Sequence, residues 1–330
     1  MKALVTGATG FTGGHLARTL AADGVPVRAL VRPRSLEGAA AIELRSLGID
    51  VVPGDLTDAA AVAAACRGCT VAYHIAATYR EAGQPDSAYR AINVDGTRHV
   101  LEGAQRAGLR RVVHCSTGGV HGHIVHPPAN EDAPFSPGDV YQETKLEAEL
   151  LARDFGRTQG IEVTVVRPIG IHGPRDVRFL KLFRGIARGR FPILGGGEVF
   201  YHLTYITDLV QGFRLAADVP GAAGRPYIIG GPEYTTLNEL AARIARVLGV
   251  RPPWIRLPAW PFWLAGAACE AVCVPLRIEP PLYRRRVDFY TKSRAFDTTR
   301  ARTELGYVPR VSLDEGLRLT AAWYREQGLL

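Results

Sequence analysis

The chain has 330 residues, enough for one large domain or two moderate ones. Hydrophobic residues make up 47% and charged residues 22%, which is typical of an ordinary soluble globular protein and excludes a disordered or fibrous one. The net charge of +8 favours an anionic ligand, but the basic residues are scattered and no recognised motif accompanies them, so we expect no nucleic-acid partner.

Apolar strand-like runs alternate with helical patterns through the first half of the chain. The predicted strands cover residues 2–6, 27–31, 50–52, 70–75, 111–116 and 163–167, and the predicted helices cover 11–23, 58–66, 89–107 and 141–159. This alternation predicts an α/β protein with a doubly wound parallel sheet, the Rossmann arrangement. Ligands of such sheets bind at the carboxyl ends of the strands.

A glycine triplet occupies the first predicted strand-to-helix turn, in the segment Thr-Gly-Ala-Thr-Gly-Phe-Thr-Gly. This spacing lets the chain turn sharply, pass close to a pyrophosphate and pack the helix tightly on the sheet. The helix N-terminus then offers free N–H groups to the phosphates. We therefore predict a dinucleotide site, with a purely structural turn as the alternative. The predicted contacts in this loop are Gly7, Thr9, Gly10, Phe11, Thr12 and Gly13.

The position about 20 residues beyond these glycines distinguishes the two nicotinamide cofactors, because NAD-preferring sites place a carboxylate there for the ribose 2′-OH. Val31 holds that position, and Arg32 follows it, with Arg34 two residues further on. Two arginines can clamp a 2′-phosphate. The sequence thus predicts NADP, with NAD as the alternative.

Tyr141 and Lys145 lie four residues apart in a predicted helix, so both project from one face. A tyrosine acts as a base near neutrality only if its pKa falls from ~10 by ~2 to 3 units, or about 3 to 4 kcal/mol. An ammonium ~5 Å away at an effective dielectric of ~20 supplies about 3 kcal/mol. Ser116 and Thr117 end the preceding strand, where a hydroxyl can bond a substrate oxygen. These four residues are the predicted catalytic group.

Beyond Pro174 the pattern loosens into Pro- and Gly-rich stretches, and a helix at 206–217 and a strand near 227–229 are expected to return to the sheet. We expect residues 1–170 and 204–231 to form the dinucleotide-binding domain. Residues 171–203 and 232–330 are then a smaller, mostly helical substrate-binding domain.

The most apolar segment, residues 260–276, is bracketed by prolines, interrupted by Glu270 and shorter than the ~20 residues that span a bilayer. We expect a buried or substrate-covering helix there and no stable membrane insertion, with peripheral membrane contact as the alternative. No signal peptide precedes the first strand, so a cytoplasmic location is expected. The pairs Cys66/Cys69 and Cys269/Cys273 have spacings that would suit zinc, but no third or fourth ligand lies near either pair in the sequence. The histidines at 121, 123 and 126 precede two prolines and indicate a substrate-side loop, so no metal is expected.

Taken in this order, the glycine loop, Ser116/Thr117 and Tyr141/Lys145 resemble the extended short-chain dehydrogenase/reductase family, also described as the NAD-dependent epimerase/dehydratase superfamily. The likeness covers most of the 330 residues. It extends to Asp55-Leu56, His74-Ile75-Ala76-Ala77, Asn93-Val94-Asp95-Gly96-Thr97, Arg167-Pro168 and Gly173-Pro174. The resemblance implies further cofactor contacts at Asp55, Leu56, Ala76, Ala77, Asn93, Tyr141, Lys145, Pro168 and Ile171.

In that family the catalytic Ser or Thr stands five residues before a Gly, in a segment that usually ends Val-Tyr-Gly. Val120-His121-Gly122 fills this place, so the role maps to Thr117, with Ser116 as its neighbour. His121 replaces the usual Tyr and is a candidate substrate residue; the alternative is a loop histidine satisfied by local hydrogen bonds.

The resemblance implies hydride transfer between nicotinamide C4 and a substrate carbinol carbon. Tyr141 would move the hydroxyl proton, Lys145 would lower the pKa of Tyr141 and hold the nicotinamide ribose, and Thr117 would stabilise the oxygen that gains charge. Family dimers pair the helices that correspond to 89–107 and 141–159, so a homodimer is expected by resemblance.

Two substrate classes compete within the family. Nucleotide-sugar epimerases and dehydratases usually carry an Arg where Tyr201 stands here, and they often carry an Asn where Gly170 stands. Residues 167–174 look more like the hydroxysteroid dehydrogenase and dihydroflavonol reductase branches, and the apolar run 260–276 suits an apolar substrate. Against this, Arg184, Arg188 and Arg190 are able to grip a diphosphate.

We therefore expect an NADP-linked oxidoreductase that acts on a secondary alcohol or ketone of a mainly apolar small molecule, such as a steroid, terpenoid or flavonoid. The predicted substrate residues are His121, Tyr201 and Arg184. The alternative is a nucleotide-sugar epimerase or dehydratase that retains NAD. A third possibility is a nucleotide-sensing regulator without activity, but Thr117, Tyr141 and Lys145 are all present and argue against it.

Overall fold

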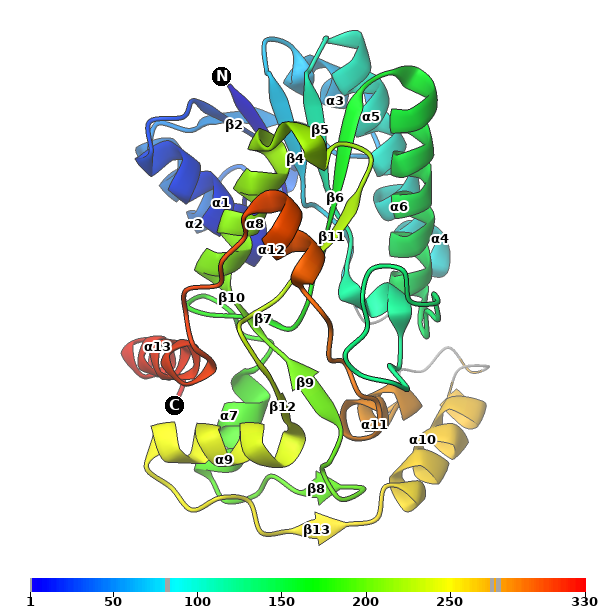
Figure 1. Cartoon of the computed structure of the whole chain (residues 1–330), viewed down its shortest axis with the longest axis vertical. Helices are drawn as coiled ribbons and strands as arrows, with labels where there is room; N and C mark the ends of the chain where they lie inside the picture. The colour runs from blue at the N-terminus through cyan, green and yellow to red at the C-terminus, as the bar shows by residue number, and fades with distance from the viewer. Residues whose placement is uncertain (1, 81–83, 274–275, 277–279) are drawn as a thin grey trace.

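The computed structural model describes residues 2–80, 84–273, 276 and 280–330. Its centre is a seven-stranded parallel sheet with the strand order β11-β6-β5-β4-β1-β2-β3 (Figure 1). The strands are β1 (Ala3–Thr6), β2 (Val27–Val31), β3 (Asp50–Pro53), β4 (Val71–His74), β5 (Arg111–Cys115), β6 (Glu162–Pro168) and β11 (Pro226–Ile229). The predicted doubly wound parallel sheet is confirmed, because each strand predicted in the first half is present in it.

Parallel pairing brings the carboxyl ends of these strands to one edge of the sheet. The register shows it: Thr6, the last residue of β1, lies opposite Leu30 of β2 and His74 of β4. The order in which strands are added to the sheet reverses at β1 and β4, and these two strands lead to helices on opposite faces, so a crevice opens at this edge.

Helices cover both faces of the sheet. One face carries α1 (Phe11–Ala22), α2 (Ala39–Ser46), α8 (Ile206–Asp218) and α12 (Thr299–Leu305), and the other carries α3 (Ala59–Cys66), α5 (Gly96–Arg106) and α6 (Val140–Gln159). The long helix predicted at 89–107 is divided: α4 (Asp86–Arg90) and α5 are joined by a wider, π-helical turn at Ala91–Asp95. Helix α2 was not predicted, because only Ala41 and Leu44 of its eight residues are buried and the apolar period is too short to recognise.

The remaining elements lie beyond the carboxyl edge of the sheet, in the lower half of Figure 1. They are α7 (Leu180–Ala187), α9 (Leu237–Leu248), α10 (Trp260–Cys273), α11 (Arg284–Thr291) and α13 (Leu313–Glu326), with the short strand pairs β7 (Ile171–His172) and β10 (Thr204–Tyr205), β8 (Ile193–Leu194) and β13 (Arg256–Leu257), and β9 (Phe200–His202) and β12 (Tyr234–Thr236). Helices α7, α9 and α13 share a second hydrophobic core. Within the described part of the chain, no helix combines the length and apolarity that crossing a membrane requires.

The C-terminal segment is divided between the two halves of the molecule. Helix α12 packs against β11 and α8 of the sheet, whereas α13 packs against α9. The sequence placed all of 232–330 on the substrate side, so α12 is an exception to that expectation.

Candidate active site

A cleft of about 1150 Å³ runs along the carboxyl edge of the sheet, between the sheet and the lower elements. Most of the predicted cofactor contacts line it: Gly7, Thr9, Gly10, Phe11, Thr12, Gly13, Arg32, Asp55, Leu56, Ala76, Ala77, Tyr141, Pro168 and Ile171. Of the predicted catalytic residues, Ser116, Thr117 and Tyr141 line it as well. Residues predicted from separate motifs therefore meet in one space.

The glycine loop forms a backbone cradle at one end of the cleft. Gly7 has φ +74°, and a Cβ on it would lie 2.8 Å from the backbone nitrogen of Ala76. A Cβ on Gly13 would lie 2.3 Å from the carbonyl oxygen of Gly7. Helix α1 begins at Phe11 without a side-chain cap, so its first N–H groups are available to an anion. This cradle fits the diphosphate of a dinucleotide.

Two arginines lie near Asp55, at the end of the cleft beside β2 and β3. Arg32 lines the cleft, whereas Arg34 is not among its lining residues. Burial acts to raise the pKa of Asp55, but hydrogen bonds from Thr57 and the charges of Arg32 and Arg34 outweigh it and lower that pKa. Neither arginine pairs with a carboxylate anywhere in the described residues, so both charges remain available to a ligand.

Thr117 and Tyr141 come from two elements that meet at the centre of the cleft. Thr117 follows β5, and its hydroxyl oxygen accepts a hydrogen bond from the backbone N–H of Gly119 at 3.0 Å, which leaves its own proton free to donate. Tyr141 lies in the first turn of α6, which Asp139 caps by accepting from the N–H of Gln142 at 2.9 Å. A short helix cap thus fixes Tyr141 at the cleft.

The surroundings of Tyr141 differ from those the sequence predicted. Burial, with smaller effects of Cys115 and Tyr79, raises the pKa of Tyr141, while Arg80 and Arg178 lower it. The expected net lowering by Lys145 is therefore wrong for this structure, because burial outweighs the nearby cations. The cation that faces the ring is Arg80, whose guanidinium carbon lies 5.9 Å from the centre of the Tyr141 ring.

Arg80 lines the cleft, although no sequence pattern predicts it as a site residue. It forms an ion pair with Asp139 at 2.7 Å, and its φ of +44° is an uncommon conformation for a long side chain. The Tyr79 ring meets the Tyr141 ring edge-on, with centroids 4.8 Å apart. No motif marks positions 79 and 80, so only the folded chain shows that they frame Tyr141.

Lys145 lies one helical turn beyond Tyr141, 2% exposed, and is not among the residues that line the cleft. Burial lowers its pKa, while Cys115 and Glu149 act to raise it. Beneath it lie His74 and His114, whose pKa values are lowered by burial and then by the Lys145 charge. The structure therefore gives Lys145 a buried position behind the cleft wall.

Ser116, which lines the cleft, and His121, which does not, belong to one buried polar network. Ser116 donates its hydroxyl proton to Glu149 at 2.6 Å, and Glu149 pairs with Arg167 at 2.5 Å, both side chains being fully buried. Arg167 also donates to Nε2 of His121 at 3.0 Å. His121 is 1% exposed and lies outside the cleft lining, a position that fits the alternative of a histidine satisfied by local hydrogen bonds. The buried arginine draws the imidazole inward.

Asn93 and Arg184 also have structural partners in place of the predicted ligands. The Asn93 amide accepts from the N–H of Thr78 at 2.8 Å and donates to the Thr144 hydroxyl at 3.0 Å, so it ties a cleft segment to α6 but does not line the cleft. Arg184 donates to the carbonyl of Leu329 at 2.7 Å and lies outside the lining. In this structure the polar groups of both residues are satisfied within the protein, and their ligand contacts remain predictions.

The opposite wall of the cleft is built from aromatic rings and long basic side chains. Tyr201 lines it, and the proton of its hydroxyl is already donated to the Phe289 carbonyl. The aromatic lining residues here are Phe179, Phe191, Tyr201, Phe289, Tyr290 and Phe296, and the basic ones are Arg178, Lys181, Arg190, Arg286 and Arg294. Among the described residues, the side chains of Lys181, Arg190 and Arg294 have no hydrogen-bond or ion-pair partner.

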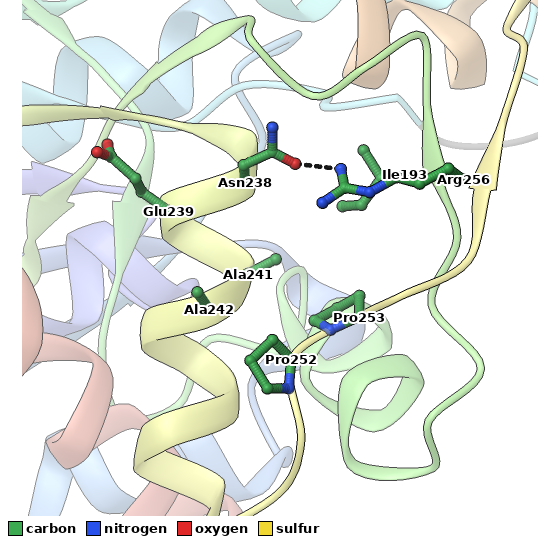
Figure 2. A pocket seen from close by; sticks show the side chains of 8 residues that line it. All are labelled: Ile193, Asn238, Glu239, Ala241, Ala242, Pro252, Pro253 and Arg256. Carbon is green, nitrogen blue, oxygen red and sulfur yellow. Dashed lines mark hydrogen bonds between the residues drawn. The ribbon is translucent and has the colours of Figure 1, made fainter.

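A second, smaller pocket of about 320 Å³ lies between α9 and residues 252–256 (Figure 2). Arg256 donates there to the side-chain oxygen of Asn238, and Glu239 is used in the capping box of α9. None of its lining residues lines the large cleft. Its polar groups are thus occupied in holding α9 and its neighbouring segment together.

The other candidates for metal ligands do not converge. In the described part of the chain, no three His, Cys, Asp or Glu side chains come together as a metal ion requires. All five cysteines are free thiols, and burial raises the pKa of Cys66 to about 12. Cys66 and Cys69 are both buried, as structural thiols are.

Relatives with assigned activities match the whole chain. It is 32% identical to sterol demethylase protein B of Methylococcus capsulatus, with 100% of both chains covered. It is 31% identical to a 3β-hydroxysteroid dehydrogenase/Δ5→4-isomerase of Mycobacterium tuberculosis, covering 98% of this chain and 90% of the relative. Among solved structures, a dTDP-glucose 4,6-dehydratase from Streptomyces venezuelae with NAD bound has a TM-score of 0.78 and 28% identity over 99% of this chain and 97% of that one.

Residues 3–230 match the model of the NAD dependent epimerase/dehydratase family, and this range contains the glycine loop, Thr117, Tyr141 and Lys145. One of the relatives is named as a dehydrogenase, and the solved structure is a dehydratase with NAD bound. The protein therefore belongs to the NAD-dependent epimerase/dehydratase family of enzymes.

Proposed function

We propose that this enzyme is an NADP-linked oxidoreductase that interconverts a secondary alcohol and a ketone on a mainly apolar small molecule. The observation that carries the proposal is the cleft itself, in which a hydroxyl pair, Thr117 and Tyr141, faces a wall of aromatic rings. Tyr201 and Phe289 belong to that wall, and Tyr201 replaces the arginine that nucleotide-sugar enzymes usually carry. An apolar ring system gains by leaving water for such a surface.

The residues around the centre of the cleft have definite parts in this reaction. The bound dinucleotide supplies a hydride acceptor for oxidation, or a donor for reduction, at nicotinamide C4. In oxidation, Thr117 donates a hydrogen bond to the substrate oxygen, and Tyr141 as phenolate takes the hydroxyl proton while the carbinol carbon gives up its hydride. The cations that favour the phenolate of Tyr141 are Arg80 and Arg178, both of which line the cleft, while Lys145 lies buried one helical turn beyond it.

The preference for NADP rests on Arg32 and Arg34. Both are exposed and unpaired within the described residues, and Arg32 lines the cleft beside Asp55. A 2′-phosphate adds negative charge beside these cations, and charge-assisted hydrogen bonds to arginine are strong. The 2′-hydroxyl of NAD in the same place carries no charge and forms weaker hydrogen bonds with these arginines.

The names of several relatives agree with an apolar alcohol or ketone. Besides the two steroid-related proteins, the chain is 30% identical to a farnesyl-dihydroquinoline-oxide ketoreductase of Stigmatella aurantiaca, over 96% of this chain and 95% of the relative. Steroids and farnesyl groups share large apolar surfaces. We therefore place the substrate in this broad class.

A second candidate function is nucleotide-sugar epimerisation or dehydration with retained NAD. The unpaired Lys181, Arg190 and Arg294 favour it, since they offer a diphosphate three cations on the substrate side of the cleft. The two functions differ in their products: oxidation changes the cofactor stoichiometrically, whereas epimerisation leaves it unchanged.

The test begins with the purified protein and the mass of any dinucleotide that copurifies with it. Absorbance of the reduced cofactor is then followed with panels of steroid, terpenoid and flavonoid alcohols and ketones, with NADP and with NAD. UDP- and GDP-sugars form the second panel, with sugar products resolved by chromatography. Turnover of an apolar alcohol or ketone supports the proposal, and conversion of a nucleotide sugar without net redox change overturns it.

A further inference from the structure

Helix α10 presents its apolar face to solvent, the reverse of an ordinary surface helix. Trp260 is 67% exposed, Leu264 52% and Val272 62%, and these residues recur at helical spacing along one side. The opposite side holds Gly266, the one buried residue of the helix. The exposed surface of α10 is therefore formed by large apolar side chains.

The single charge on α10 faces inward. Glu270 accepts from the backbone N–H of Arg284 at 2.8 Å and pairs with its guanidinium at 2.6 Å. A Cβ on Gly266 would lie 2.9 Å from the backbone nitrogen of Arg284, so the two helices are in close contact at this point. Gly266 and Glu270 thus hold α10 against α11, which leaves Trp260, Leu264 and Val272 exposed.

The apolar surface includes three of the chain's four tryptophans. Trp254, 77% exposed, precedes the helix, and Trp260 and Trp263 lie in its first turn. Tryptophan is the side chain most suited to a membrane–water interface, since it has a large apolar ring and one N–H donor. We name Trp254, Trp260, Trp263, Leu264 and Val272 the tryptophan patch.

Positive charge flanks the tryptophan patch on both sides in the chain. Arg251 precedes it, Arg256 lies between Trp254 and Trp260, and Arg286 follows it on α11, all three exposed. Arg284 and Glu270 cancel each other in an ion pair, as do Asp288 and Lys292, so the three other arginines leave an excess of positive charge. An anionic lipid surface complements this charge, and the apolar side chains complement its acyl region.

We propose that the tryptophan patch docks this protein on the surface of an anionic lipid bilayer. Helix α10 has 14 residues, too few to cross a bilayer, so it lies in the interface. Helix α11, on which α10 packs, also contributes Arg286, Phe289 and Tyr290 to the large cleft (Figure 1). Docking therefore holds the substrate wall of the cleft next to the membrane, where apolar molecules concentrate.

The test measures cosedimentation of the full-length protein with phosphatidylcholine vesicles, with and without phosphatidylglycerol, in the absence of cofactor and substrate. The wild type should bind the phosphatidylglycerol vesicles and lose binding as salt rises. Bromine-labelled lipids should quench its tryptophan fluorescence. Because no catalysis is measured, the outcome is independent of the proposed oxidoreductase activity.

A matched pair of variants locates the surface. Leu264→Gln/Val272→Gln removes two apolar side chains of the patch that are 52% and 62% exposed, whereas Ile42→Gln/Val308→Gln removes two elsewhere that are 53% and 59% exposed. The first pair should weaken vesicle binding on the order of tenfold, and the control should change it less than about twofold. Both keep the tryptophans as reporters.

Three binding results and one light-scattering result would each overturn the proposal. The first is no binding of the wild type to phosphatidylglycerol vesicles at low salt, and the second is equal binding to neutral vesicles. The third is equal loss of binding in both variant pairs. Light scattering adds a further check: a larger mass for the wild type than for Leu264→Gln/Val272→Gln means that a second copy covers the patch, and this also overturns it.

Discussion

The two walls of the large cleft are built in different ways. The sheet wall is formed largely by backbone, with the glycine loop, the strand ends and the first turn of α6 held by short-range contacts. The facing wall is formed by side chains from α7, α11 and the short strand pairs, which come from distant parts of the chain. The first wall presents N–H groups and hydroxyls, and the second presents aromatic rings and unpaired cations.

This difference separates the part of the cleft that any dinucleotide would contact from the part that contacts the substrate. A backbone cradle recognises the diphosphate that every dinucleotide carries, and substitutions there disturb folding and cofactor binding together. Side chains on the facing wall can change without moving the backbone, so they set the choice of substrate. Substitutions on the two walls should therefore have separable effects.

The largest effect is expected at Tyr141, where the two walls face each other. Tyr141→Phe removes the proton acceptor and should lower kcat by roughly 10² to 10⁴-fold, the range for a positioned acid–base group. The dissociation constant of the dinucleotide and the melting temperature should change little, because the ring keeps its contact with Tyr79. An active Phe variant would reject the assignment.

On the sheet wall, Gly13→Ala should disturb stability and cofactor binding together. The added Cβ meets the Gly7 carbonyl oxygen at 2.3 Å, and such overpacking costs about 1 to 3 kcal/mol of unfolding free energy. Gly221→Ala is the control, because no atom lies within 4 Å of its added Cβ. Denaturant unfolding and dinucleotide titration measure both quantities; equal behaviour of the two variants contradicts the backbone cradle.

Arg32→Ala tests cofactor choice at the edge of the same wall. Loss of a charge-assisted contact of about 1.5 to 3 kcal/mol should raise the NADP dissociation constant roughly 10 to 100-fold while leaving that of NAD unchanged. Arg34→Ala should have a smaller effect, because Arg34 does not line the cleft. Arg188→Ala, an exposed arginine outside the cleft, controls for net charge. Equal or tighter binding of NAD to the wild type would refute the arginine argument.

Arg80→Ala should move the pH profile of alcohol oxidation upward by about one pH unit. The phenolate of Tyr141 is the active form, burial raises the pKa of Tyr141, and the Arg80 cation opposes that rise. The rate therefore increases with pH through this pKa, and removing the cation moves the increase to higher pH. Arg80→Lys keeps the charge and should retain most of the original profile.

A uniform loss of rate at every pH in the Arg80→Ala variant would contradict the effect of the Arg80 charge on the pKa of Tyr141. It would mean that Arg80 acts through its ion pair with Asp139, the cap of α6, and not through its charge on Tyr141. Asp139→Asn separates the two, since it breaks the ion pair while keeping the cation.

The smallest effect is expected on the facing wall. Tyr290 lines the cleft and stacks on Phe191 with ring centroids 5.8 Å apart. Tyr290→Ala should raise KM for an apolar substrate several-fold, on the order of 1 kcal/mol, and leave kcat and the dinucleotide dissociation constant nearly unchanged. A change in dinucleotide affinity would show that the two walls are not separable.

The sheet wall could be predicted from sequence because local patterns determine it. Gly7, Gly10 and Gly13 need no distant partner to be recognised, and Tyr141 follows a helix cap at Asp139. His121 shows what a local pattern does not contain: its place in the motif suggests the substrate, whereas its hydrogen bond from Arg167, 46 residues later, depends on the folded chain. Arg80 is the opposite case: no sequence pattern marks it, and only its tertiary contact with Asp139 brings it over Tyr141.

The facing wall could not be predicted for the same physical reason. Arg184 and Arg190 belong to one basic stretch, yet Arg184 turns to the Leu329 carbonyl and Arg190 to the cleft. Phe289 and Tyr290 carry no motif and reach the cleft only because α11 packs beside it. Their arrangement depends on contacts between segments that are far apart in the sequence.

One measurement tests the account most directly: the purified enzyme is incubated with NADP and an apolar secondary alcohol from the panel that carries deuterium on the carbinol carbon. The account predicts equal amounts of ketone and reduced cofactor, with the deuterium at nicotinamide C4, and a rate lower by roughly 10² to 10⁴-fold in Tyr141→Phe. Absence of reduced cofactor with every apolar alcohol or ketone tried, together with conversion of a nucleotide sugar without net redox change, would contradict it.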